Sequence, residues 1–484
     1  MILRILIVAL GLTFSTYFFR KAAGTLNVRK LNLISYTYYL FILQTYIGTS
    51  LMFLGDRGHY TLKYVIHEAS IDKTFYYVLL TAILFPLVIM LVYKILKVDM
   101  NNIYDNYLGR ETDIDNERSV FYIILFISMV CMALMILLFI KIGYIPLFKI
   151  FFAESGFNFK TERIKVAQIS IVNQYVRNIL VLSLIPVLSL IAFTYAYKTK
   201  KVRWIILFGA LFVAAICTKT YNFAKTPVAF YLFTLVIVYI MLNNGIKRLY
   251  FYGILAFLGM MIFLLYRVMG VKVDLSLYNG PIGRTLFTQA GTLIYHFDFF
   301  PVSFPFLMGR SFSSSILGVL GSNMTSVRSA KIIMSYYGSR SVYEGIAGVM
   351  NSLFIGEAYA NFGVIGVMIS IVYVALLFGI ILWLFTTKFK KSALNVVLLG
   401  VLTSELANTT QGGFFDFVYN ANMIVIVIMF IFVNYASKYL GDKLPDRTYR
   451  SKYWKGNSFS CSFEGVSSYK PNQRFGYSLK RKEM

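Results

Sequence analysis

The charged residues of one long stretch, residues 271–354, are the first in this sequence that could do chemistry. Six cations against three acids give the stretch a net charge of +3, with one histidine in addition. Arginine meets phosphate oxygens through a planar fork of donors, so a basic loop is suited to an anionic ligand. The charged residues and the histidine are Lys272, Arg284, Arg310, Arg328, Lys331, Arg340, Asp274, Asp298, Glu344 and His296.

The same stretch also carries apolar surface that must pack against something. Residues 282–296 and 328–338 predict short amphipathic helices lying on a membrane surface. Such a loop suits a lipid-linked anion, because cations would meet a phosphate or diphosphate while aromatic faces meet isoprenoid or sugar. The alternative is an external domain whose charges are merely solvated. The apolar residues are Phe287, Phe297, Phe299, Phe300, Phe304, Phe306, Tyr336, Tyr337 and the run Ile316–Leu320.

The elements that position this loop are apolar helices. Hydrophobic residues make up 58% of the 484 residues and charged residues 14%, whereas soluble domains average about 45–50% and about 25%. Apolar runs long enough to cross a bilayer as helix recur along the chain, without the alternation of membrane strands. The sequence therefore predicts an all-α polytopic membrane protein with about eleven transmembrane helices. They are expected at residues 2–19, 31–54, 75–97, 119–142, 171–197, 203–220, 227–244, 249–270, 355–386, 392–411 and 418–437.

The basic residues predict the orientation of these helices. Lys and Arg gather in alternate connections and in the tail, which places those connections in the cytoplasm, the N-terminus outside and the C-terminus inside. The connection at 98–118, with its acidic run Asp113 to Glu117, departs from this pattern, but acidic residues count little in the rule. Two extracytoplasmic loops follow, at 143–170 and, larger and partly helical, at 271–354. The predicted organisation is thus helices 1–8 with the first outer loop (1–270), the large outer loop (271–354), helices 9–11 (355–437) and a basic tail (438–484).

The formal net charge of +26 does not indicate nucleic acid here, since the basic residues fit topology and anionic-lipid contact better. The three cysteines offer no external disulfide pair, and the sequence has no CxxC or HExxH metal motif.

Six further ionisable residues fall near the predicted outer ends of helices. Groups at membrane depth are costly and tend to face a cavity or a partner, although long cations can also reach the headgroups. We therefore expect an outward-facing polar cavity, whereas a transporter would place its charges near the midplane. The residues are Arg177, Lys219, Lys225, Arg267, Glu357 and Glu405.

Four short stretches resemble the Wzy-type polysaccharide repeat-unit polymerases, within the O-antigen polymerase and ligase superfamily. Gly143-Tyr144-Ile145-Pro146-Leu147 opens the first outer loop, and Lys219–Pro227 (KTYNFAKTP) begins a helix with basic residues. Gly309-Arg310-Ser311 lies in the large loop, and Gly356–Gly363 (GEAYANFG) leads into the next helix. The architecture extends the resemblance over nearly the whole chain. Some members repeat an Arg-x10-Gly pattern in both outer loops; Arg310 and Gly321 meet it, but Arg163 is followed at that spacing by Gln174.

The resemblance implies a membrane glycosyltransferase of the bacterial cytoplasmic membrane that polymerises undecaprenyl-diphosphate-linked repeat units into O-antigen or capsular polysaccharide. The donor already carries its leaving group, so no cofactor and no metal are expected. Implied partners are the lipid-linked donor and acceptor glycans, membrane lipids, and a chain-length regulator and flippase of the same pathway.

The same resemblance suggests roles for individual residues. Cations would stabilise charge on the departing diphosphate, and a base would take the proton of the attacking hydroxyl. Expected to bind substrate are Arg163, Lys225, Arg310, Arg328 and Arg340, and candidate catalytic residues are His296, Glu344 and Glu357.

Each candidate catalytic residue has a structural alternative. His296 could be a buried histidine bonded to Asp298, Glu344 a partner of Arg340 four residues earlier, and Glu357 a capping or pairing acid near a helix start. We expect Arg310 and Arg340 to line one cavity with Glu344 or Glu357. At the level of the whole protein, the alternatives are an O-antigen ligase and a lipid-linked oligosaccharide flippase without chemistry.

Overall fold

The computed structural model describes residues 1–152, 157–268, 276–278, 280–319, 321–345 and 347–443, apart from the side chains of 160, 258, 261–268 and 442–443. The predicted loop residues Lys272 and Asp274, the side chain of Arg267, Leu320 and most of the basic tail lie outside this description. Within it the protein is all-helical, without strands, as predicted. An isolated β-bridge pairs Asp113 with Ser392.

Each of the eleven helical ranges predicted from the sequence coincides with a helix. Seven are long and apolar enough to cross a membrane, by length and composition. Their helices are α1 (Ile2–Ala23), α4 (Ala69–Ile95), α6 (Glu117–Ile142), α9–η4–α10 (Gln174–Thr199), α11 (Val202–Lys219), α19 (Ile355–Trp383) and α22 (Ala421–Lys443). The other four are α2–η2–α3 (Leu33–Phe53), α12 (Thr226–Leu242), α13 (Arg248–Val268) and α20 (Ala393–Thr409).

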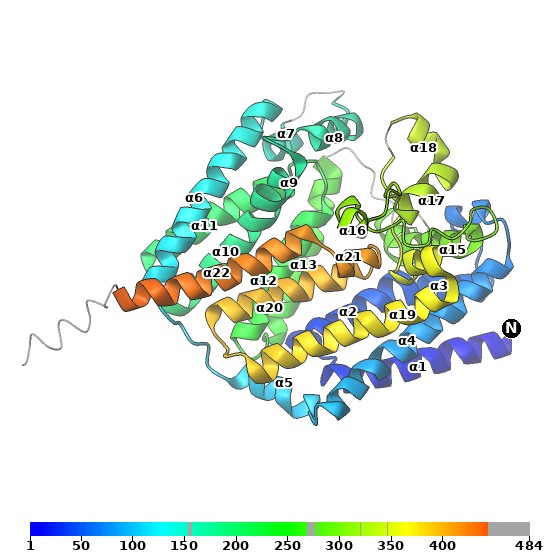
Figure 1. Ribbon diagram of the computed structural model, residues 1–484, viewed down its shortest axis with the longest axis horizontal. Coiled ribbons are helices and arrows are strands. Elements are labelled where there is room, and N and C mark those ends of the chain that lie inside the picture. Colours follow the sequence, from blue (N-terminus) through cyan, green and yellow to red (C-terminus); the bar gives the residue numbers. More distant parts are fainter. Residues whose placement is uncertain (153–156, 269–275, 279, 320, 346, 444–484) are drawn as a thin grey trace, which may run out of the picture.

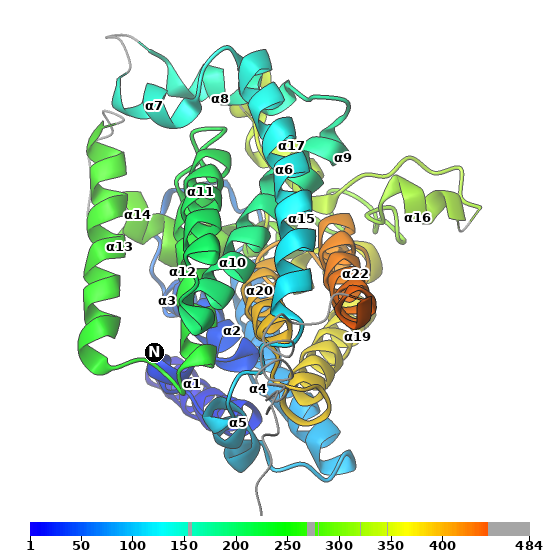
Figure 2. The same cartoon turned by 90° about the vertical axis from the view of Figure 1, so that its left-hand side faces the viewer.

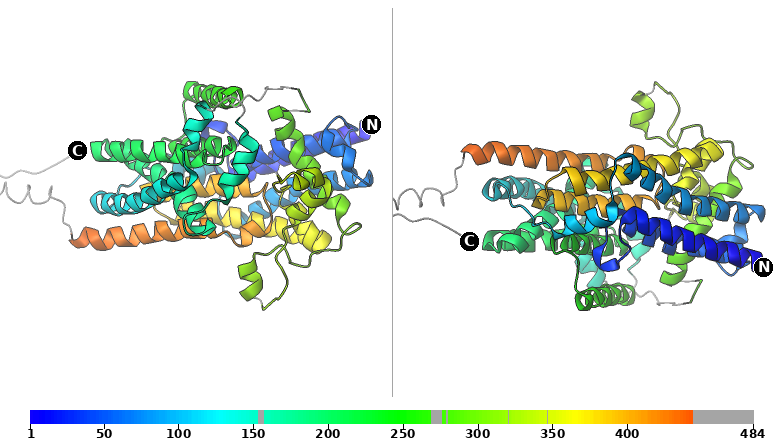
Figure 3. Two further views of the ribbon diagram at one scale, coloured as in Figure 1. Left: turned by 90° about the horizontal axis from the view of Figure 1, so that it is seen from above. Right: turned by 90° about the horizontal axis from the view of Figure 1, so that it is seen from below.

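The connecting segments gather at two opposite ends of the helical bundle. In Figure 1, α7 (Pro146–Phe151) and α8 (Phe159–Gln168) lie at the top, the helices of the large loop lie on the right, and α5 (Met100–Gly109) lies at the bottom. Figure 3 places the N-terminus and the C-terminal end of α22 at opposite ends of the bundle. We call the end that carries the large loop the loop end of the bundle.

Helix α5 was not predicted; its stretch was taken for a plain connection. Its Tyr104 and Tyr107 are buried, and Tyr104 donates a 2.6 Å hydrogen bond to the carbonyl of Leu31. The buried Lys391 caps the neighbouring backbone, because its Nζ donates to the carbonyls of Leu108 and Arg110, each at 2.8 Å. These bonds fasten α5 to the end of the bundle opposite the large loop.

The large loop contains a buried helix where the sequence predicted a surface one. Residues 282–296 correspond to η5 (Arg284–Thr288) and α15 (Gln289–Phe299), and every residue from Ala290 to Phe299 is buried. The expectation of a membrane-surface helix is therefore wrong for α15. The reason is that both of its faces are covered: α15 packs between α3, α4 and α19. Phe297, for example, stacks on Tyr77 with ring centroids 5.0 Å apart.

The buried carboxylate of Asp298 fastens α15 to its surroundings. It accepts hydrogen bonds from the backbone N–H groups of Ile66 (2.7 Å) and His67 (2.8 Å). The hydroxyls of Ser70 and Tyr337 also donate to it, each at 3.0 Å, and the His67 ring lies 3.1 Å away. One acid thus joins the start of α4, α15 and α17 (Ser329–Tyr337).

A backbone break in α19 separates its first two turns from the part that continues through the bundle. Gly363 has φ +60° and ψ −143°, a conformation reserved for glycine, and Phe362 before it is also non-helical. A Cβ on Gly363 would stand 3.1 Å from the ring of Phe306. The break lets residues 355–361 tilt toward the large loop.

Two helices lie at the margin of the fold. Helix α13 stands at one edge of the bundle, and the short α16 (Ser314–Val319) projects away from the body (Figures 2 and 3).

Candidate functional site

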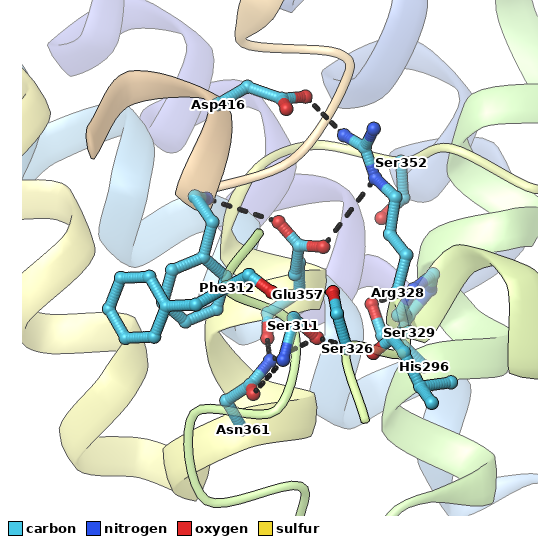
Figure 4. A network of polar contacts seen from close by, with 12 residues as sticks. His296, Ser311, Phe312, Ser326, Arg328, Ser329, Ser352, Glu357, Asn361 and Asp416 are labelled. Atoms are coloured by element: carbon cyan, nitrogen blue, oxygen red, sulfur yellow. Dashed lines mark hydrogen bonds and ion pairs between the residues drawn. The ribbon is translucent and has the colours of Figure 1, made fainter. Parts of the chain in front are cut away.

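Glu357 lies at the centre of a polar network at the loop end of the bundle (Figure 4). It comes in the first turn of α19, and the residue is 4% exposed. Its Oε2 accepts the backbone N–H of Phe415 at 3.1 Å. Gly413 permits this approach, because a Cβ there would stand 2.3 Å from Oε2 and 2.8 Å from Nη2 of Arg328.

Arg328 covers this carboxylate from the solvent side. It is the N-cap residue of α17, and its side chain is about one-third exposed. Its Nε lies 3.6 Å from Oε1 of Glu357, and its Nη2 donates to Oδ2 of Asp416. Burial lowers the pKa of this guanidinium, but the two carboxylates outweigh that effect and the net shift is upward. Arg328 is therefore a fixed cation held between two acids.

Arg310 is held next to Arg328 by backbone pairing. The N–H of Val327 donates to the carbonyl of Arg310 at 2.8 Å, so the segments bearing the two arginines run side by side. The guanidinium of Arg310 reaches Thr325 Oγ1 through Nη2 at 3.4 Å, while its buried Nε has no hydrogen-bond partner among the described residues. It retains donor capacity for a ligand.

Asn361 attaches the segment of Arg310 to α19. Its Oδ1 accepts the N–H groups of Gly309 (3.1 Å) and Ser311 (3.3 Å), and its Nδ2 donates to Ser311 Oγ at 2.9 Å. Backbone bonds from Leu307 and Met308 to α19 complete the attachment. The two stretches GRS and GEAYANFG, noticed separately in the sequence, thus form one unit.

His296 lies beside this network as a buried, neutral side chain. Its Nδ1–H donates to the carbonyl of Thr292 at 2.8 Å, so Nε2 is left to accept from Ser329 Oγ at 3.3 Å. Burial lowers the pKa of its imidazole to about 4, an effect that the Thr292 bond only partly opposes. The suggested bond between His296 and Asp298 is absent from the described contacts, since Asp298 is engaged by His67, Ser70 and Tyr337 instead.

Arg340 and Glu344 stand apart from the network and pair with each other. They belong to the short helix α18 (Ser339–Tyr343) and its C-cap, with 3.0 Å between Nε and Oε1. The Arg340 side chain is 91% exposed. The geometry is the four-residue ion pair given above as the structural alternative, and such exposed pairs are weak.

The two remaining predicted substrate ligands come from other segments of the loop end. Arg163 is exposed on α8 and makes no hydrogen bond or ion pair with any described residue. Lys225 precedes α12. Burial lowers the pKa of its ammonium to about 8, and the nearby charge of Arg284 acts in the same direction.

The outer-end charges noted in the sequence have different surroundings. Arg177 is buried and donates to the carbonyls of Ala167 and Ile169, each at 2.6 Å, so it anchors the end of α8. Lys219 and Glu405 line a polar cavity of about 230 Å³ between helices.

A long apolar groove begins at Asp416. It has a volume of about 700 Å³ and runs between α19, α20 and α22 toward Phe389 and Tyr435. Leucine, isoleucine, valine and phenylalanine dominate its walls. Because Asp416 is bonded to Arg328, the polar network and the apolar groove are continuous.

Sequence reasoning missed three residues of this site: Asp416, Asn361 and Gly413. Gly413 lies in the connection between α20 and α22, and Asp416 lies in the short helix α21 (Phe415–Val418) within it. This connection carried no recognised motif. The available signal was an acid three residues after a Gly-Gly pair, in a connection predicted to share the side of the large loop.

The arrangement combines fixed cations, a buried acid and a half-exposed acid at the mouth of an apolar groove. Such a site can hold an anionic headgroup while an apolar tail lies in the groove. Across the described ranges no group of three or more His, Cys, Asp or Glu side chains could hold a metal ion.

No family model, no curated protein and no solved structure matches this chain.

Proposed function

We propose that this protein is a polysaccharide repeat-unit polymerase, a metal-independent membrane glycosyltransferase that uses undecaprenyl-diphosphate-linked glycans as donor and acceptor. The supporting observation is the junction of the Arg328–Glu357–Asp416 cluster with the apolar groove. An isoprenoid diphosphate has the matching shape: a strongly anionic head on a long apolar tail.

In the proposed reaction, a hydroxyl oxygen of the acceptor sugar attacks the anomeric carbon of the donor. The bond from that carbon to the diphosphate oxygen breaks, and undecaprenyl diphosphate leaves with the electron pair. Arg328 and Arg310 stabilise the charge on the leaving diphosphate. The hydroxyl proton passes to a carboxylate, and Asp416 is better exposed for this than Glu357. Glu357 then keeps Arg328 in place.

The proposal includes eleven membrane crossings, with the N-terminus outside and the C-terminus in the cytoplasm of a bacterium. It is supported by the separation of the connections into two ends and by the cations of the predicted cytoplasmic connections. A reporter that is active only outside the cytoplasm, fused after Gly338, should be active, and one fused after Lys391 inactive. The reverse pattern would refute the orientation.

The function is tested by the length of the polymer in cells. Deletion should leave single repeat units on lipid, and wild-type protein should restore the full glycan ladder. Arg328→Ala and Arg310→Ala should fail to restore it at normal expression, whereas Lys331→Ala, which removes an exposed cation of the same α17, should succeed. Polymer of full length in the deletion strain would refute polymerisation and favour another transport role or a scaffold.

Purified protein separates a polymerase from a ligase by the acceptor. Joining of repeat units to one another in the presence of a chelator supports a metal-independent polymerase, and transfer only to a lipid A core indicates a ligase. Assays with the flippase or the chain-length regulator omitted test the proposed pathway partners.

A further inference from the structure

A second polar cavity lies inside the bundle, separate from the Arg328–Glu357–Asp416 cluster. It has a volume of about 230 Å³ and is bounded by α10, α11, α12, α20 and α22. Since one water occupies about 30 Å³ of liquid, it has room for about eight waters, or for one compact polar group. Its polar wall is contributed chiefly by Lys219, Glu405, Asn408, Asn420, Asn422 and Tyr231.

The cation of this cavity makes no direct ion pair, although the charge of Glu405 acts on it from the same cavity wall. Lys219 is the last residue of α11, and its Nζ has no hydrogen bond, and no carboxylate oxygen within 4.0 Å, among the residues described. Glu405 lines the same cavity, and its carboxylate likewise has no hydrogen bond there. An unpaired ammonium at membrane depth is costly and therefore marks a functional site rather than a structural one.

Other polar groups of the cavity wall are satisfied within the protein. Thr234 donates to Ser404 Oγ at 2.7 Å, and Tyr231 shares a 2.7 Å hydrogen bond with Ser189. The side chains of Asn408 and Asn422, in contrast, make no hydrogen bond with any described residue. The cavity thus offers one ammonium, one carboxylate and two free amides to an occupant.

The charge balance selects the class of occupant. A diphosphate would bring two or more negative charges next to Glu405, more than the single ammonium of Lys219 can balance. A single carboxylate matches the single ammonium of Lys219. Glu405 can then accept hydrogen bonds from hydroxyls, and the amides can both donate and accept. A carboxylate on a hydroxyl-rich ring meets these conditions together.

The cavity is connected with the proposed reaction site through α22. Asn420 and Met423 line both this cavity and the apolar groove that begins at Asp416. A glycan whose lipid lies in the groove would have one of its sugars within reach of the cavity.

We propose that this cavity recognises an acidic sugar, a hexuronate or a similar hydroxylated carboxylate, and so selects the repeat unit that the protein accepts. The carboxylate binds Lys219, and the ring hydroxyls bind Glu405, Asn408 and Asn422. The identity of the sugar as substrate rests on the proposed function; the binding site itself does not.

The test is equilibrium binding of glucuronate, glucose and inorganic phosphate to the purified full-length protein in lipid nanodiscs. Glucuronate should bind at least tenfold more tightly than glucose. Lys219→Met should weaken glucuronate binding at least tenfold, and Lys219→Arg should retain most of it. Lys94→Met, which removes an exposed lysine in the last turn of α4, is the matched control and should leave binding unchanged.

Glu405→Gln separates the two kinds of anion. The glutamine keeps an oxygen that accepts hydrogen bonds from hydroxyls but carries no charge, so the variant should strengthen phosphate binding more than glucuronate binding, because phosphate carries the larger negative charge. Equal binding of glucuronate and glucose, absence of glucuronate binding at millimolar concentration, or Lys219-dependent preference for phosphate would each overturn the proposal. The glycan ladder is read independently, so polymerisation can fail while binding holds, and binding can fail while polymerisation holds.

Discussion

The guanidinium of Arg328 lies over the buried carboxylate of Glu357, with 3.6 Å between Nε and Oε1. The pair joins the large loop to the first turn of α19, and Asp416 extends it to the connection before α22. Three segments that are distant in sequence therefore meet around one cation. We therefore expect both the stability and the proposed activity of the protein to depend on this contact.

Replacing Arg328 alone should lower the free energy of unfolding more than replacing Arg328 and Glu357 together. Arg328→Met leaves the Glu357 carboxylate buried without its partner, for which we expect a loss of about 3 kcal/mol. The double variant Arg328→Met/Glu357→Gln should recover part of that loss, because no buried charge remains. Thermal unfolding of Arg328→Met, Glu357→Gln and the double variant, purified in detergent, measures the coupling. Strict additivity would contradict a direct interaction between these side chains.

Gly413 should not tolerate even a methyl group. Gly413→Ala places a carbon 2.3 Å from Oε2 of Glu357 and must displace that carboxylate or the connection. We expect loss of the glycan ladder and a lower melting temperature. Gly209→Ala in α11, where a Cβ meets nothing within 4 Å, is the control and should behave as wild type. A normal ladder in Gly413→Ala would show that the close approach is dispensable.

Binding of an anion near Lys225 should weaken as the pH rises. Burial holds the pKa of this lysine at about 8, so its cationic fraction falls between about pH 7 and about pH 9. The contribution of Lys225 to binding is present below the folded pKa and is lost above it. Lys225→Met should remove this part of the pH dependence in a diphosphate-binding assay. A profile that is the same in wild type and variant would exclude Lys225 as a ligand.

The same pKa shift makes the free energy of unfolding depend on pH in the opposite direction to ligand binding. Because the ordinary pKa of lysine, 10.5, exceeds the folded value of about 8, the unfolded chain binds more protons between these values. The contribution of Lys225 to the free energy of unfolding therefore rises with pH across that window. Chemical unfolding at several pH values, compared with Lys225→Met, measures it; a fall with pH would contradict the assignment.

Asp298 should be structurally essential without taking part in the reaction. Asp298→Asn presents an amide N–H₂ group to neighbours that are themselves donors, at a cost of about 2–3 kcal/mol. We expect a lower melting temperature and a polymerisation defect that is relieved at lower growth temperature. Asp105→Asn, which alters an exposed acid paired with Lys30, is the control and should have little effect. A variant that is stable but inactive would instead place Asp298 in the reaction.

The helices could be predicted from the sequence because the length of each apolar run gives the length of its helix. The local periodicity gave a wrong prediction of the burial of α15, because amphipathic spacing does not show whether a second helix covers the polar side. Contacts between distant residues were out of reach altogether. Arg328 and Asp416 are separated by 88 positions, so nothing in the local pattern around either residue indicates the other. Lys219, Glu357 and Glu405 could be singled out, because charges at membrane depth are rare enough to be conspicuous.

The five hydrogen bonds that attach residues 307–311 to residues 360–361 have a mechanical consequence. The glycine break at Gly363 allows this assembly to swing on the remainder of α19, but the bonds make its two parts swing as one body. Arg310 and Glu357 must therefore travel together. A bulky glycan that enters or leaves would not separate Arg310 from Glu357. It would separate both residues from the connection at 411–416, which is the weaker contact, and we expect the site to open there.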